Sequence, residues 1–135
     1  MVGDDHCHLF VYGTLKPGER AFARLCEPFA IAAQAAQTRG RLYHLPLGYP
    51  AMTLELGWVR GVLLTFPSAQ SLTAIDAFEE YYPDCPETSE YQRRLHPVYD
   101  LDQLCLGLAW AYTMDLDRVH RLRGRWLPQG HWAEF

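Results

Sequence analysis

The apolar residues of this chain gather in short runs that end at glycine, proline or polar residues. The first run, residues 9–12, stops at Gly13, and a second run covers residues 58–66. Short apolar runs bounded by turn residues are typical of buried strands, so each of these runs is predicted to form a β-strand. Two further strands are predicted at residues 91–99 and 104–113, the second of them rich in leucine, alanine, tryptophan and tyrosine.

The clearest helix is predicted after Pro67 and Ser68, because proline suits the first turn of a helix and serine is a good N-cap. Leu72, Ile75 and Glu79 then follow at helical spacing, which places all three on one face. This face is apolar apart from Glu79. The predicted inner face of the helix therefore ends in a carboxylate.

The other segments complete the predicted fold. Residues 19–26 predict a short helix that ends at Pro28, and residues 48–50 predict a turn. Residues 30–37, rich in alanine and glutamine, are compatible with either a helix or a strand. Strands dominate and the helices are few and short, so the pattern predicts an α+β fold with a curved or closed sheet.

Length and charge narrow the class of protein. The 135 residues fit a single domain covering residues 1–135, since no linker, repeat or shift in composition divides the chain. A net charge of −4 argues against a nucleic-acid partner, and the arginine cluster at 118–125 is expected to be a solvated surface. No apolar run approaches the ~18 residues of a membrane span, so no membrane association is predicted.

Cysteine and histidine usage points to no metal or thiol chemistry. The cysteines stand far apart without a Cys-x-x-Cys pair, and residues 1–6 carry no secretion signal, so free thiols and a cytoplasmic location are expected. His6 and His8 can share one face of a strand, but no third metal ligand accompanies them. No cysteine stands in a recognisable nucleophile motif.

Two features are candidates for chemistry. Residues 12–18 lead from a strand into a tight loop, where Gly13 leaves backbone N–H groups open to an anion; a plain turn is the simpler alternative. Glu79 lies on the apolar face of its helix, although most glutamates at helix ends are solvated. A carboxylate partly withdrawn from water becomes a better base near neutral pH.

Several segments recur in one order over nearly the whole chain. They are Phe10-Val11-Tyr12-Gly13-Thr14-Leu15-Lys16-Pro17-Gly18, Gly40-x-Leu42-Tyr43, Gly48-Tyr49-Pro50-Ala51, Val59-x-Gly61, Ile75-Asp76-Ala77-Phe78-Glu79, Pro86-x-x-Ser89-x-Tyr91-x-Arg93 with Val98, Ala109-x-Ala111-Tyr112 and Gly130-x-Trp132. As an ordered set they resemble the γ-glutamylcyclotransferase (AIG2-like) family, and in particular its γ-glutamylamine cyclotransferase-like branch.

The resemblance implies a small mixed β-barrel flanked by short helices, with no metal and no organic cofactor. It also implies a small-molecule γ-glutamyl substrate, whose own α-amine attacks its γ-carbonyl to form 5-oxoproline and release an amine. In such enzymes the backbone N–H groups of Gly13, Thr14 and Leu15 would bind the α-carboxylate or the developing oxyanion. Glu79 would act as the general base.

The same resemblance suggests that Tyr12 and Tyr91 line the pocket, although packing in the barrel core is an equal alternative. Arg93 is a candidate for a structural ion pair. The chain departs from the family at Glu80, where a glycine is usual. A non-catalytic domain of the same fold that binds a small molecule or a protein is the second hypothesis, and the oligomeric state and the leaving amine stay open.

Overall fold

The computed structural model describes residues 6–13, 16, 26, 29–46, 48–79 and 91–132. Its strands are β1 Cys7–Val11, β2 Ala32–His44, β3 Pro50–Phe66, β4 Gln92–Tyr99, β5 Cys105–Thr113 and β6 Arg125–Leu127. Its helices are the 3₁₀ helix Ala69–Ser71, α2 Leu72–Phe78 and α3 Leu116–Arg121. The helix predicted at 19–26 lies outside the described residues, apart from Cys26.

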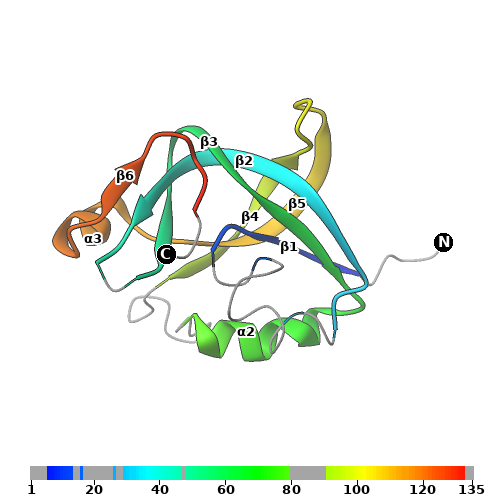
Figure 1. The fold of residues 1–135 in the computed structure, drawn as a ribbon. Helices are drawn as coiled ribbons and strands as arrows, with labels where there is room; N and C mark the ends of the chain where they lie inside the picture. Colours follow the sequence, from blue (N-terminus) through cyan, green and yellow to red (C-terminus); the bar gives the residue numbers. More distant parts are fainter. Residues whose placement is uncertain are drawn as a thin grey trace.

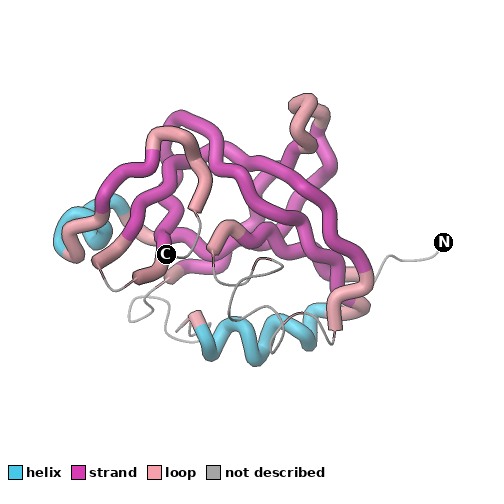
Figure 2. Tube along the Cα trace, viewed as in Figure 1, coloured by secondary structure: helices cyan, strands magenta, loops and turns pink. Residues whose placement is uncertain are grey.

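The strands form a closed ring. Neighbours follow the order β3-β1-β5-β4-β2, and β2 pairs again with β3 to close it, while β6 extends β2. β1 and β5 are parallel and the other pairs are antiparallel, so the barrel is mixed (Figure 1). Closure leaves few free strand edges. Figure 2 shows α2 below the barrel and α3 at its side, which confirms the predicted barrel with short flanking helices.

Two apolar clusters share strand β1 because its side chains alternate. Leu9 and Val11 belong to the cluster that also holds Leu72 and Ile75 of α2. Phe10 belongs instead to the cluster that includes Trp132, near the end of the chain. The described part of the chain contains no helix long and apolar enough to cross a membrane.

Most of the predicted helices and strands are confirmed, and two of the predicted segments belong to longer strands. The segment at 30–37, left open between helix and strand, lies mainly in β2, because it pairs with β3 and β4. The strand predicted at 58–66 is the second half of β3, which begins at Pro50. Helix α3 and strand β6 were not predicted. Ser68 caps the 3₁₀ helix as expected, accepting a hydrogen bond from the Gln70 N–H at 3.3 Å.

A wide bulge interrupts β3 where it faces β2. Arg39 pairs with Trp58 and Arg41 pairs with Thr53, so residues 54–57 stand opposite Gly40 alone. Gly40 and Gly57 have φ angles of 155° and 143°, values that side chains disfavour. A Cβ at Gly57 would lie 2.8 Å from the Gly40 carbonyl oxygen, so both glycines are needed for this close approach.

Replacing Gly61 with alanine is expected to lower the free energy of unfolding by about 1–3 kcal/mol. The new methyl group would lie 2.8 Å from Phe10 Cζ, and closer still to the Val11 carbonyl oxygen. Urea denaturation followed by tryptophan fluorescence measures the loss. The exposed Ala35→Ser on β2 is the control and should change stability by less than about 0.5 kcal/mol. Equal midpoints for both variants would contradict the packing of β1 against β3.

Candidate active site

Glu79 lies just after α2. Its N–H donates to the Ile75 carbonyl at 2.9 Å, which continues the last helical turn, and its side chain is half-buried. Burial raises the pKa of Tyr12 well above the usual tyrosine value, and the negative charge of Glu79 raises it further. Burial and then the same charge raise the pKa of Cys26 to about 12. The carboxylate is therefore within electrostatic reach of both side chains.

The Tyr12 hydroxyl both donates and accepts a hydrogen bond. Its hydroxyl donates to the Tyr112 carbonyl oxygen at 2.7 Å and accepts from the Met52 N–H at 3.3 Å. The side chain is buried in the cluster inside the barrel. These contacts confirm the packing role given as the alternative for Tyr12, and contact with a substrate stays a prediction.

Gly13 opens the loop predicted to hold an anion, and its backbone lies close to Pro50. A Cβ at Gly13 would lie 2.7 Å from Pro50 Cγ, so only glycine fits without a shift. The Gly13 carbonyl accepts from the Lys16 N–H at 3.0 Å, and the buried Lys16 ammonium donates to the Trp132 carbonyl. The loop is thus fastened at both of its described ends. Thr14 and Leu15 lie outside the described residues.

Tyr91, which is far from Gly13 in the sequence, also contacts Pro50. It precedes β4, is buried, and donates its hydroxyl proton to the Pro50 carbonyl at 2.8 Å. Its ring lies 6.5 Å from the ring of Tyr49. Pro50 therefore joins Tyr91 to Gly13. As for Tyr12, the packing role is observed and the pocket-lining role stays a prediction. Glu80 lies outside the described residues.

A buried polar network fixes α2 to the barrel one turn before Glu79. Arg93 donates from Nε and Nη2 to the two oxygens of Asp76, at 2.8 and 3.1 Å, and Tyr112 donates to Asp76 Oδ1 at 2.5 Å. The Arg93 guanidinium also lies 4.5 Å from the ring centre of Trp110. Arg93 is thus the structural ion-pair partner that was one of its predicted roles.

The hydrogen bond between Asp76 and Tyr112 was not predicted, because the sequence indicated these residues only as parts of family segments. The available signal was the spacing of Asp76 three residues before Glu79, which places two carboxylates along one side of the helix. A buried carboxylate needs partners, and these come from strands later in the chain. Local periodicity carries no information about such partners.

The alternative metal site at the first strand receives no support from the described residues. His8 Nδ1 lies 3.1 Å from Thr65 Oγ1, within hydrogen-bonding distance, whereas Cys7 is buried on the other side of β1. The described part of the chain holds no group of three or more side chains suited to a metal ion. Cys7, Cys26 and Cys105 are free thiols.

Replacing Tyr112 with phenylalanine is expected to lower the free energy of unfolding by about 1–3 kcal/mol at pH 7, because Asp76 loses a buried donor. Urea denaturation measures the loss. Tyr99→Phe is the matched control, since no hydrogen bond of the Tyr99 hydroxyl occurs among the described residues, and it should stay within about 0.5 kcal/mol. Equal effects of the two substitutions would contradict the network.

The stability advantage of the wild type over Tyr112→Phe is expected to shrink above about pH 10, the ordinary pKa of tyrosine. Burial first, and then the hydrogen bond and charge of Asp76, raise the pKa of Tyr112 far above that value in the folded protein. The unfolded chain therefore loses this proton first, which favours unfolding as the pH rises. Urea denaturation of both proteins at pH 7 and 10.5 tests the slope, and a constant difference would contradict it.

Comparison with known proteins adds a family and a fold. A sequence profile described as Gamma-glutamyl cyclotransferase, AIG2-like, matches residues 9–134. The chain is also 31% identical over 108 residues to the gamma-L-glutamyl-butirosin B gamma-glutamyl cyclotransferase of Niallia circulans. That match covers 80% of this chain and 68% of the relative.

Two solved structures are similar. An AIG2-like protein of Mus musculus is 25% identical, with a TM-score of 0.62, over 81% of this chain and 77% of that one. YkqA of Bacillus subtilis is 21% identical, with a TM-score of 0.67, over 94% of this chain but only 39% of that one. The likeness to the mouse protein agrees with the small mixed barrel described above.

Proposed function

The chain belongs to the AIG2-like gamma-glutamyl cyclotransferase family, and we propose that it cyclises a γ-glutamyl amine or a related γ-glutamyl compound. The α-amine nitrogen of the substrate attacks its own γ-carbonyl carbon, and a new C–N bond closes the ring of 5-oxoproline. The original γ-amide C–N bond breaks, and the amine leaves. The nucleophile belongs to the substrate, so the protein needs no serine or cysteine for this step.

Glu79 is the general base in this proposal. Its carboxylate takes a proton from the α-ammonium group and passes one to the departing nitrogen, so the carboxylate is regenerated. The observation that supports the proposal is that Glu79 is half-buried and held in the last turn of α2 by the hydrogen bond from its N–H to the Ile75 carbonyl. Its negative charge also raises the pKa of Tyr12, which directly precedes Gly13. A base on one side and backbone donors on the other suit a γ-glutamyl head group between them.

The loop supplies the second half of the site. Backbone N–H groups of Gly13, Thr14 and Leu15 would bind the α-carboxylate or the oxyanion that forms on the γ-carbonyl. The contact of Gly13 with Pro50 and the turn to Lys16 support a loop of defined shape. The assignments of Thr14 and Leu15 rest on the family segment alone.

Positioning supplies the rest of the rate enhancement. The γ-glutamyl chain must fold back so that its amine meets its carbonyl, and a rigid site lowers the entropy cost of this arrangement. Arg93 and Tyr112 hold Asp76, which ties the end of α2 to β4 and β5. The base is thereby kept at a fixed place relative to the barrel.

Glu79→Gln is expected to reduce 5-oxoproline release by about 100-fold or more while leaving substrate binding nearly unchanged, because the amide cannot accept the proton. Mass spectrometry of 5-oxoproline over a panel of γ-glutamyl amines measures turnover, and calorimetry with the best panel member measures binding. Asp117→Asn, an exposed change on α3, is the control and should retain full activity.

Two results would contradict the proposal. Wild-type protein that binds panel members but releases no 5-oxoproline would favour the second hypothesis, a binding domain of the same fold. Full activity in Glu79→Gln would remove Glu79 from the role of base while leaving the cyclisation intact.

A further inference from the structure

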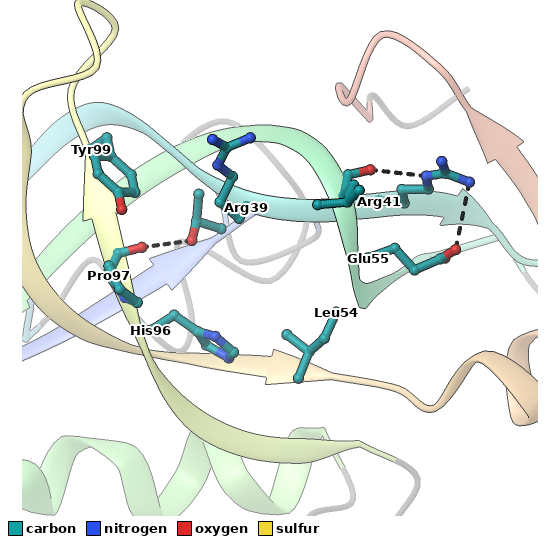
Figure 3. A pocket seen from close by; sticks show the side chains of 9 residues that line it. Arg39, Arg41, Leu54, Glu55, His96, Pro97 and Tyr99 are labelled. Atoms are coloured by element: carbon teal, nitrogen blue, oxygen red, sulfur yellow. Dashed lines mark hydrogen bonds and ion pairs between the residues drawn. The ribbon is translucent and has the colours of Figure 1, made fainter.

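A hollow opens where β2 and β4 separate. These strands pair only at Gln37 with Tyr99 and at Thr38 with Val98, and beyond this point they diverge. The Thr38 hydroxyl donates to the Pro97 carbonyl at 2.8 Å and closes the narrow end of the gap. The hollow has a volume of about 610 Å³, within the usual range for small-molecule pockets, and its lining includes neither Glu79, Tyr12 nor Tyr91 (Figure 3).

The bulge of β3, residues 54–57, forms the third wall. The Arg41 Nε–H donates to the Leu56 carbonyl at 3.0 Å and so ties the bulge to β2. Leu54 is 57% exposed and Leu56 is 83% exposed, so two leucines stand in water at the edge of a hollow. Covering them with an apolar body would remove that surface from water.

The charges of the lining leave one positive charge in excess. Arg41 pairs with Glu55 at 3.5 Å, and the same carboxylate also accepts from Tyr43 and Thr53. Arg39 lies over the ring of Trp58 at 4.3 Å and pairs with no carboxylate in the described part of the chain. A ligand with one negative charge would balance Arg39.

His96 has a ring nitrogen without a hydrogen-bond partner among the described residues. Its Nε2 is buried and makes no hydrogen bond within the described residues. Burial and then the charge of Arg94 lower the pKa of His96 below its usual value, so the ring is neutral at pH 7 and can present an N–H. Figure 3 shows the ring turned toward Leu54, on the opposite side of the hollow from Arg39.

We propose that this hollow is a second ligand site, which binds a small carboxylate attached to an aromatic or branched apolar body. The carboxylate pairs with Arg39, whose planar guanidinium suits this group. The apolar body covers Leu54 and Leu56, and a hydrogen-bonding atom at its far end would meet His96 Nε2; a probe without that atom tests the contacts with Arg39 and the leucines alone. This site is separate from the γ-glutamyl chemistry proposed for Glu79.

The test uses 3-phenylpropionate and its neutral counterpart, 3-phenylpropan-1-ol, with the full chain. The acid is expected to shift the backbone NMR signals of residues 54–57 and 96–99, and to bind at least fivefold more tightly than the alcohol. Arg39→Gln should weaken the acid by about five- to tenfold and leave the alcohol within twofold. The matched control Arg121→Gln, an exposed arginine on α3, should leave both within twofold.

Further variants separate this site from its alternatives. Leu56→Ser should weaken both probes, and because Leu56 is exposed the fold should tolerate it. Glu79→Gln should leave the binding of the acid unchanged, and a parallel loss would assign the acid to the Glu79 site instead. Equal affinity for acid and alcohol, equal losses in Arg39→Gln and Arg121→Gln, or no shift at residues 54–57 would each overturn the proposal.

Discussion

The barrel depends on the pairing of β2 with β3, because this contact turns an open sheet into a ring. The register runs from Ala32 with Thr65 to His44 with Pro50, and it shifts only around Gly40. β1 lies between β3 and β5 in this ring, and its Leu9 and Val11 share an apolar cluster with Leu72 and Ile75 of α2. The shift at Gly40 also accommodates the bulge of β3, whose residues 54–56 line the hollow between β2 and β4.

Closure does not by itself fix the end of α2, where Glu79 lies, and here the largely buried pair of Asp76 and Arg93 contributes. Removing two charges from water costs free energy, and their attraction repays it only when the geometry is good and other hydrogen bonds complete the set. Asp76 accepts two hydrogen bonds from Arg93 and a third from Tyr112, which meets this condition. These contacts join α2 to β4 and β5.

Local patterns predicted much of the fold. The apolar run at 9–12 corresponds to β1, whose side chains are buried or half-buried, so burial left a continuous signature there. The segments at 91–99 and 104–113 correspond to β4 and β5, although much of both strands is exposed. The first half of β3 was not predicted, because Pro50 begins it and Gly57 interrupts it, and both residues usually mark turns. The state of 30–37 was decided by its partner strands, which no single window of sequence contains.

The candidate site was predictable in part for the same reason. Helical spacing drew attention to Glu79, and the family segments supplied its link to Gly13. The partners of Asp76 and the gap between β2 and β4 arise from tertiary contacts, and neither has a local signature. Thr14 and Leu15 stay predictions from the sequence alone.

The place of β1 in the ring has a consequence for how the protein is made. β1 leaves the ribosome before its parallel neighbour β5, which ends at Thr113, and the Tyr12 hydroxyl pairs with the carbonyl of Tyr112, 100 residues later. Contacts between such distant parts of a chain form slowly, because a long loop must close before they stabilise anything. Until then the apolar residues around Phe10 cannot be buried in the barrel. The nascent chain therefore carries an aggregation-prone segment until β5 has been made.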